Sequence, residues 1–308
     1  MVGILPVWGW DHAGKLLTSG NARNYGRFLG ERFGTLDNVV WIMGGDAPAD
    51  GVEDVWRALA AGLEEGGGDQ LMTYHPRGDQ TSVQWFADDD WIDFHMIQGG
   101  HCLRYDVRAR LLAETYAAGK PFLDGEPLYE DHPYCWDQPP DGFSTERDVR
   151  RDAWWAVLGG AAGHTYGHHA IWQFLTEDRN PQLGARGTWT EALDFPAATQ
   201  MRHVRALIEA RPRLEPADDL LTDAGAGAER IAAATDAEGR TLAAFTAAGR
   251  PITLDLSTLS GSRLRPWWYD PRTGEVTELD AVDRGGRVEF TPPTGDSDWV
   301  LVLDAIPS

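Results

Sequence analysis

Up to about residue 210, short apolar runs alternate with longer segments in which apolar residues recur at helical spacing. Between residues 51 and 66, for example, Val55, Leu59 and Leu63 lie four positions apart, which is the spacing of one face of an α-helix. Six apolar runs predict β-strands: VGILPVWG (2–9), NVVWIMGGD (38–46), QLMTYHP (70–76), WIDFHMIQGG (91–100), KPFLDGEP (120–127) and AGHTYGHHAIW (162–172). Four amphipathic segments predict helices: 21–34, 51–66, 106–119 and 148–163.

From about residue 215 the pattern changes to short alternating segments separated by Gly, Pro and Asp turns. They are ERIAAATD, RTLAAFTA, PITLDLS, RLRPWWYD, EVTELD, RVEFTPP and DWVLVLD. Such segments predict an all-β sandwich. The earlier alternation of strands and helices predicts a parallel sheet, and at this chain length a (β/α)8 TIM barrel is the first expectation. The segment 210–219 reads as the linker, so we expect a barrel domain at 1–212 and a sandwich domain at 217–308.

Composition and charge narrow the classes of partner. Hydrophobic residues make up 42% of the 308 positions, which is ample for a globular core. The formal net charge is −21, which argues against nucleic acid and anionic membranes as partners, because both are polyanions. No apolar run approaches the roughly 18 residues of a membrane span. The 14 tryptophans serve either as core or as platforms that stack on sugar rings.

The two cysteines and the N-terminus add little. Cys102 and Cys135 have no metal-site spacing, and whether they form a disulfide depends on whether the fold brings them together. The first residues lack a basic segment and a small-residue cleavage site, so the sequence predicts no signal peptide. The chain as it stands is therefore expected in the cytoplasm, with secretion left open if translation begins further upstream.

The carboxyl ends of the predicted barrel strands carry polar residues, and this is where such barrels place their active sites. Asp46 ends one strand run and Glu126 ends another. Cleavage of a glycosidic bond needs two carboxyl groups that face each other across the bond. The alternatives are that Asp46 caps the following helix and that Glu126 forms a buried ion pair.

Further strand ends supply candidates for substrate binding. The indoles of the tryptophans are expected to stack on sugar faces, and the other side chains to bind sugar hydroxyls, to orient Glu126 or to form a buried network. These candidates are Trp8, Trp10, His75, Gln98, His101, Tyr166, His168 and Trp172. Glu130 and Asp131 either bind hydroxyls or are solvated loop acids. We expect no metal and no cofactor, although His164 and His168 with a third ligand form an alternative zinc site.

Taken in order, several stretches resemble the apiosidase-like glycoside hydrolases, which are glycoside hydrolase family 140 and its relatives. They are ILPVWGW, NVVWIMGGD, YHPRG, WIDFHMIQGGH, KPFLDGEPLYEDHP, DVRRDAWWAVLGGAAGHTYGHHAIWQ and WYDPRTGE. The resemblance implies a (β/α)8 barrel followed by a β-sandwich of the collagen-binding-like type. It implies Asp46 as the acid/base and Glu126 as the nucleophile, and an apiose-linked unit of plant pectic side chains as the substrate.

This sequence departs from the family pattern at its start. Family members carry further strand–helix units before the run 2–9, so the resemblance implies a barrel that is incomplete at its N-terminus, with six visible strands. The run 2–9 would then be an exposed edge, which a homodimer would cover. Two other functions stay open: a catalytically inactive carbohydrate-binding remnant of the same fold, and a metal-dependent hydrolase centred on His164 and His168.

Overall fold

The computed structural model describes residues 1–135 and 140–307. The described chain forms two compact units. The N-terminal unit contains Met1–Gly100 and Arg110–Glu126, and the C-terminal unit contains His101–Ala109 and the chain from Pro127 onward. Helix α5 (Tyr105–Ala117) begins in the C-terminal unit and ends in the N-terminal unit.

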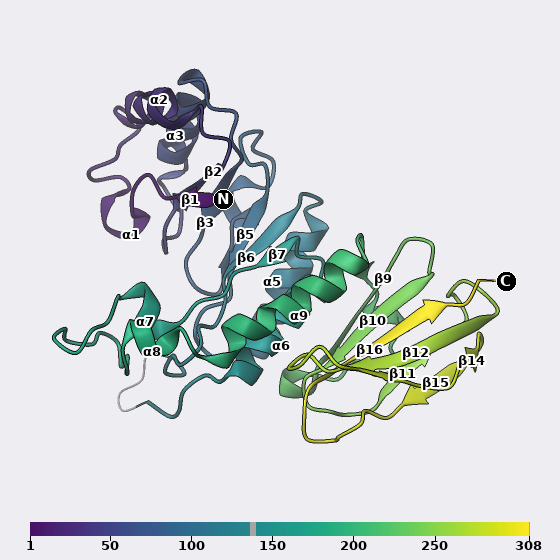
Figure 1. The fold of residues 1–308 in the computed structure, drawn as a ribbon. Coiled ribbons are helices and arrows are strands. Elements are labelled where there is room, and N and C mark those ends of the chain that lie inside the picture. Colours follow the sequence, from purple (N-terminus) through teal and green to yellow (C-terminus); the bar gives the residue numbers. More distant parts are fainter. Residues whose placement is uncertain (136–139, 308) are drawn as a thin grey trace. The chain divides into compact units, whose positions relative to one another are not determined.

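The N-terminal unit consists of strands with helical crossovers (Figure 1). Its strands are β1 (Val2–Ile4), β2 (Val39–Gly44), β3 (Met72–His75), β4 (Gln80–Thr81), β5 (His95–Gln98) and β6 (Phe122–Glu126). Its other helices are α1 (Gly9–His12), α2 (Ala22–Phe33), α3 (Glu53–Glu65) and α4 (Val83–Phe86). The order β1-β2-β3 is parallel, and β5 pairs with β6 in parallel. The Asp93 N–H, just before β5, donates to the Met72 carbonyl at 3.0 Å, so β3 and the chain entering β5 lie side by side.

Helices α2 and α3 pack closely on each other (Figure 1). Aromatic rings fill the core of the unit. A Cβ atom at Gly26 would lie 2.3 Å from the Leu59 carbonyl oxygen, so only glycine permits this approach of the two helices. The buried rings of Trp56, Tyr74 and Phe86 meet at centroid distances of 5.6 and 4.9 Å. This packing holds strand β3 in place up to its last residue, His75.

The C-terminal unit begins with helices and ends with two sheets. The first part contains α6 (Glu146–Leu158), β7 (Gly163–His164), α7 (His169–Trp172), α8 (Trp189–Ala192) and α9 (Pro196–Ala210). The larger sheet has the order β13-β12-β16-β10-β9-β8, with β14 paired to β12, and the smaller sheet pairs β11 with β15. Its strands are β8 (Glu215–Pro216), β9 (Ile231–Thr235), β10 (Thr241–Thr246), β11 (Ile252–Asp255), β12 (Arg263–Tyr269), β13 (Val276–Glu278), β14 (Val282–Asp283), β15 (Arg287–Phe290) and β16 (Trp299–Ala305).

The two sheets share one apolar core. Leu254 and Phe290 from the smaller sheet pack in the same buried cluster as Leu242 and Leu301 from the larger one. Every strand pairing within these sheets is antiparallel. The alternating segments therefore form the predicted β-sandwich, because each strand turns one face to this core.

Most of the predicted elements are present, and two are wrong in extent. The helices predicted at 21–34, 51–66, 106–119 and 148–163 appear as α2, α3, α5 and α6. The run 2–9 forms a strand only at Val2–Ile4, because Pro6 has no N–H to donate to a ladder. The run 162–172 is a strand only at Gly163–His164; its end forms helix α7, since His168 caps that helix. Tyr166 and His168, which lie in the predicted strand run 162–172, therefore lie outside strand β7.

Strand β1 lies at the edge of the three-stranded sheet, where the run 2–9 was expected to lie. Val2 in this strand is 52% exposed. Among the described residues, no helix is both long enough and apolar enough to cross a lipid bilayer.

Candidate active site

Three consecutive residues, beginning with the last residue of β2, have positive φ angles. The φ angles of Gly44, Gly45 and Asp46 are +83°, +104° and +50°. The backbone of this turn lies very close to the end of β3. The Gly45 N–H donates to the His75 carbonyl at 3.1 Å, and a Cβ atom at Gly44 would lie 2.4 Å from that oxygen. The two glycines are needed for the turn and the close approach, whereas Asp46 has a Cβ atom and adopts a positive φ angle at an energetic cost.

Asp46 does not cap the following helix. Helix α3 begins at Glu53, and its N-cap residue is Val52. The alternative explanation of Asp46 as a helix cap is therefore wrong. Asp46 is partly buried, and its backbone N–H donates to the ring nitrogen Nδ1 of His75 at 3.2 Å.

The same imidazole reaches Glu126. His75 Nε2 lies 2.8 Å from Glu126 Oε2, and the two side chains are only 10% and 14% exposed. Burial lowers the pKa of His75. The hydrogen bond to Glu126 and the charge of Glu126 raise it, as do the Pro76 carbonyl and the charge of Asp46, and together they outweigh the effect of burial. The net pKa of His75 therefore lies above its ordinary value. His75, predicted to bind substrate, thus contacts both the Asp46 turn and the Glu126 carboxylate.

A β-bulge places Gln98 beside Glu126. The register of β5 and β6 shifts after Ile97, so Gln98 pairs with Glu126 although Ile97 pairs with Asp124. Residues in register on parallel strands point to the same face of the sheet. The Gln98 side chain is buried, and among the described residues its Oε1 atom has no hydrogen-bond partner. This oxygen therefore retains the capacity to accept a hydrogen bond.

Two exposed indoles flank the turn. The Trp8 ring lies against Gly45, where an added Cβ atom would be 2.9 Å from Cε3, and its centroid is 6.4 Å from that of His75. The backbone N–H of Trp10 donates to the Gly45 carbonyl at 3.3 Å, and the Arg77 guanidinium lies 5.0 Å from the Trp10 ring centroid. Trp8 is 46% exposed and Trp10 is 48% exposed, so their apolar faces remain accessible to a ligand.

The remaining sequence-predicted residues belong to the C-terminal unit. His101 is buried there, and its ring stacks on His132 at 4.2 Å and meets Tyr129 at 4.5 Å. The next residue, Cys102, forms a disulfide with Cys135. The disulfide joins the loop of His101 to the segment that follows β6, which answers the pairing question that the sequence left open.

Tyr166 donates its hydroxyl to the Glu130 carboxylate at 2.7 Å. Glu130 also accepts the N–H of Ala197 in the first turn of α9 at 3.2 Å, a position that suits a negative charge. Asp131 forms an ion pair with Arg186. Glu130 and Asp131 are 1% and 5% exposed, so the interpretation as solvated loop acids is wrong. Their spacing in the sequence contained no signal of this burial.

His168 caps helix α7. Its Nδ1 atom accepts the Ala170 N–H at 3.1 Å, and the edge of the ring meets Phe195 at a centroid distance of 4.5 Å. Burial lowers the pKa of His168. Trp172 is 50% exposed, and its indole N–H donates to His169 Nδ1 at 3.1 Å, which fixes the ring while leaving it accessible.

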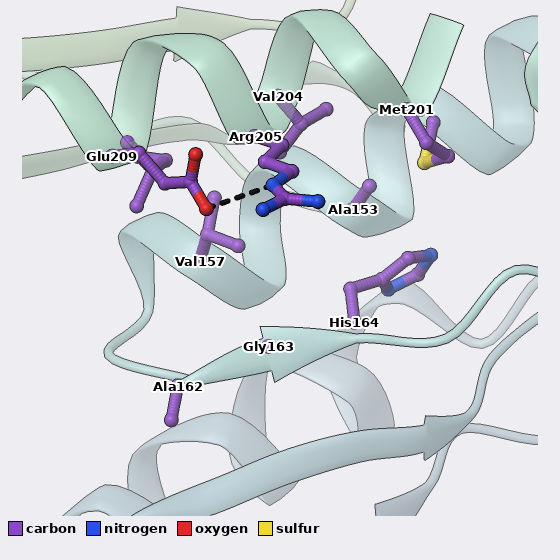
Figure 2. A pocket seen from close by; sticks show the side chains of 10 residues that line it. Ala153, Val157, Ala162, Gly163, His164, Met201, Val204, Arg205 and Glu209 are labelled. Carbon is purple, nitrogen blue, oxygen red and sulfur yellow. Dashed lines mark hydrogen bonds and ion pairs between the residues drawn. The ribbon is translucent and has the colours of Figure 1, made fainter. Parts of the chain in front are cut away.

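A separate pocket lies between α6, β7 and α9 (Figure 2). Its volume is about 280 Å³, and Ala153, Val157 and Val204 are among its apolar lining residues. Glu209 is the one carboxylate among the lining residues, and it forms an ion pair with Arg205 at 2.7 Å. The pocket therefore lacks the two carboxyl groups that glycoside cleavage requires.

Within residues 1–135 and 140–307, the structure forms no group of three His, Cys, Asp or Glu side chains arranged to hold a metal ion.

Comparison with protein families identifies two matching regions. The family described as "Apiosidase-like, catalytic domain" matches residues 1–215, and the family described as "Putative collagen-binding domain of a collagenase" matches residues 216–304. No curated protein sequence matches the chain.

Several solved structures of glycoside hydrolases are also similar to this chain. One described as "Glycoside hydrolase" is 31% identical with a TM-score of 0.93, and the match covers 98% of this chain and 73% of that one. A glycoside hydrolase family 5 structure from Bacteroides vulgatus is 32% identical with a TM-score of 0.93, covering 98% and 70%. A family 27 β-L-arabinopyranosidase from Geobacillus stearothermophilus, at 13% identity and a TM-score of 0.53, covers 92% and 62% and is similar in fold alone.

Proposed function

The chain belongs to the apiosidase-like glycoside hydrolases and is a glycosidase, and we propose that Asp46 and Glu126 are its catalytic carboxyl groups. One observation carries the proposal: the His75 ring contacts both the backbone of Asp46 and the carboxylate of Glu126. Asp46 lies 29 positions before His75 and Glu126 lies 51 positions after it, and both contact this imidazole at the carboxyl ends of β2, β3 and β6. That edge is where a barrel of this type places its active site.

The proposed reaction has two steps. In the first, the Glu126 carboxylate attacks the anomeric carbon while the Asp46 carboxyl group gives its proton to the leaving oxygen. In the second, the Asp46 carboxylate takes a proton from water, the water oxygen attacks the same carbon, and Glu126 leaves as a carboxylate. The Nε2–H of His75 stabilises the ionised form of Glu126, which the first step requires.

Substrate contacts follow from the groups near the turn. Trp8 and Trp10 are proposed to stack on sugar rings, and Gln98 Oε1 is proposed to accept a sugar hydroxyl. For His101, Tyr166, His168 and Trp172, the sequence-based assignment to substrate binding stands as a proposal of its own. The substrate is proposed to be a glycan of the plant pectic type with a terminal apiose-linked unit, as the family resemblance implies.

We also propose how the barrel, the two domains and a dimer are arranged in sequence and topology. Strands β1, β2, β3, β5 and β6 are proposed to form part of the wall of a TIM barrel, which their parallel order and helical crossovers support. The division into a catalytic domain at 1–212 and a sandwich domain at 217–308 is supported by the point at which the two family matches meet. The edge strand β1 is proposed to pair with a second copy of the chain, and sedimentation as a monomer would contradict this.

Substitution of the two carboxyl groups tests the catalytic proposal. Glu126→Gln and Asp46→Asn should each lower the release of sugar from a pectic glycan at least about a hundredfold, since general acid–base and nucleophilic groups contribute at least this much. An aryl glycoside with a good leaving group separates their roles. On that substrate Asp46→Asn should retain the first-step burst, whereas Glu126→Gln should not.

Glu209→Gln provides a matched control, because Glu209 is an exposed carboxylate on helix α9. Its activity should equal that of the unsubstituted protein. Equal activity of the Glu126→Gln protein, measured after circular dichroism has shown a native fold, would refute the assignment. Glycan binding by calorimetry without any turnover would instead support the carbohydrate-binding alternative.

A further inference from the structure

The two contacts of the His75 ring require one particular tautomer. Nδ1 accepts the backbone N–H of Asp46 at 3.2 Å, so Nδ1 must carry a lone pair. In the neutral ring the proton is then on Nε2, where it donates to Glu126 Oε2 at 2.8 Å. The neutral ring therefore satisfies the Asp46 turn and the Glu126 carboxylate at the same time.

A carbonyl oxygen competes with the Asp46 N–H for the same nitrogen. The carbonyl oxygen of Pro76 lies 2.9 Å from Nδ1, and a carbonyl can only accept a proton from it. A protonated ring would satisfy Pro76 and Glu126 but would direct its Nδ1–H at the N–H of Asp46, so that two donors face each other. Asp46 holds a φ angle of +50°, so its turn depends on such contacts to stay in place.

We propose that His75 is a positioning residue that couples the charge of Glu126 to the placement of Asp46. While Glu126 is ionised, its charge favours the protonated ring, and the hydrogen bond to the Asp46 N–H is weakened. When Glu126 becomes neutral, the ring loses its proton to water, Nδ1 accepts the Asp46 N–H, and the turn is fixed.

The groups that face the His75 ring have opposing effects on its protonation, as this coupling requires. The charges of Glu126 from β6 and of Asp46 from the turn at the end of β2 act on it, and both favour the protonated form. The Trp8 ring, 6.4 Å away, adds an uncharged neighbour, and burial favours the neutral form. Burial and the carboxylates oppose each other, so loss of the Glu126 charge shifts the ring toward its neutral form.

This step rests on the proposed function only where catalysis is concerned. If Glu126 is the nucleophile, it loses its charge when it forms the ester with the sugar. His75 would then fix Asp46 in the second step, when Asp46 must take a proton from the attacking water. His75 acts through Asp46 and Glu126, and it transfers no proton to the substrate.

Nuclear magnetic resonance of the full chain, labelled with ¹⁵N in histidine and aspartate, tests the coupling without any need for activity. In the unsubstituted protein, the backbone amide signal of Asp46 should shift with pH at the same midpoint as the His75 ring nitrogens. In Glu126→Gln, the His75 midpoint should fall by about one to three pH units, which is the range expected for loss of an adjacent opposite charge. Glu209→Gln, the distant carboxylate control, should leave that midpoint unchanged.

Two substitutions of His75, each of which keeps one of its two hydrogen-bonding functions, distinguish coupling from a purely structural role. His75→Gln keeps a donor toward Glu126 but offers no ring nitrogen to Asp46, and His75→Asn keeps an acceptor near Asp46. The pH dependence of the Asp46 amide should disappear in both. Burst kinetics should show a slower second step in His75→Gln, partly restored in His75→Asn.

An Asp46 amide that does not follow the His75 titration, or a His75 midpoint unchanged by Glu126→Gln, would overturn the coupling. Coupling observed in a protein that cleaves no glycoside would leave the inference intact and count against the proposed function alone.

Discussion

Replacement of Asp46 by glycine should stabilise the protein while it removes activity. Asp46 holds a φ angle of +50° although it is not a glycine, and it follows two glycines with φ angles of +83° and +104°. A turn made of Gly44, Gly45 and a third glycine would have no Cβ atom in the left-handed region. We infer that the carboxyl group is kept at this position for its chemistry and at the expense of stability.

The size of the effect follows from the backbone. A residue with a Cβ atom costs about 1–2 kcal/mol in the left-handed region. Glycine avoids this cost but loses about 0.5–1 kcal/mol more chain entropy on folding. Asp46→Gly should therefore raise the free energy of unfolding by roughly 0.5–1 kcal/mol. Asp46→Ala should lower it by up to about 1 kcal/mol, because aspartate tolerates this region better than alanine does.

Urea unfolding followed by tryptophan fluorescence measures these differences as shifts of the transition midpoint. Arg213→Gly is the matched control, because Arg213 is exposed, has a φ angle of +68° and belongs to the segment before β8. It should give a similar stabilisation with full activity, whereas Asp46→Gly should lose at least about a hundredfold in turnover. A lower midpoint for Asp46→Gly than for Asp46→Ala would refute the reasoning.

Three further predictions concern the C-terminal unit. Asp298→Ala should lower the free energy of unfolding by about 3–5 kcal/mol in urea titrations, because it leaves the buried Arg150, now paired through bonds of 2.7 and 2.8 Å, without its counter-charge. Burial raises the pKa of Glu130 in the folded state and outweighs the hydrogen bonds that favour its ionised form. As the pH rises from the ordinary pKa of glutamate through this raised pKa, ionisation of Glu130 therefore lowers the stability of the fold. Glu130→Gln should therefore unfold later than the unsubstituted protein at pH 7 but not at pH 4, and an equal difference at both would contradict this. Reduction of Cys102–Cys135, 33 positions apart, should lower the thermal midpoint through a loss of about 3–4 kcal/mol, with Cys102→Ser as the reductant-insensitive control.

Sequence patterns located the secondary structure well wherever the signal is local. Helices α2 and α3 follow from the repeat of apolar residues along one face, and strands β9 to β13, β15 and β16 follow from alternation between turns. The two-residue strand β14 was not predicted. The extents failed where a single residue intervened. Pro6 ends the first strand early, and His168 starts a helix within a run that reads as a strand.

Strand ends and family resemblance were enough to single out Asp46, His75, Gln98 and Glu126. What each of them contacts could not be predicted in this way. The role of His75 depends on its ring lying between a backbone N–H and a carboxylate, and the place of Gln98 depends on a bulge after Ile97. A shift of one residue in the register would turn Gln98 to the other face of the sheet.

By itself, then, the sequence determined the strand–helix alternation, the sandwich that follows it, and the residue types available at the strand ends. These are properties of neighbouring residues, which periodicity and composition record. The tertiary structure alone decided that Glu130 is buried at the start of α9, that Cys102 meets Cys135, and that the Asp46 turn and Glu126 share one imidazole. Each of these meetings joins residues far apart in the chain, and only the packing and register of the folded elements bring them within the few ångströms over which hydrogen bonds and charges act.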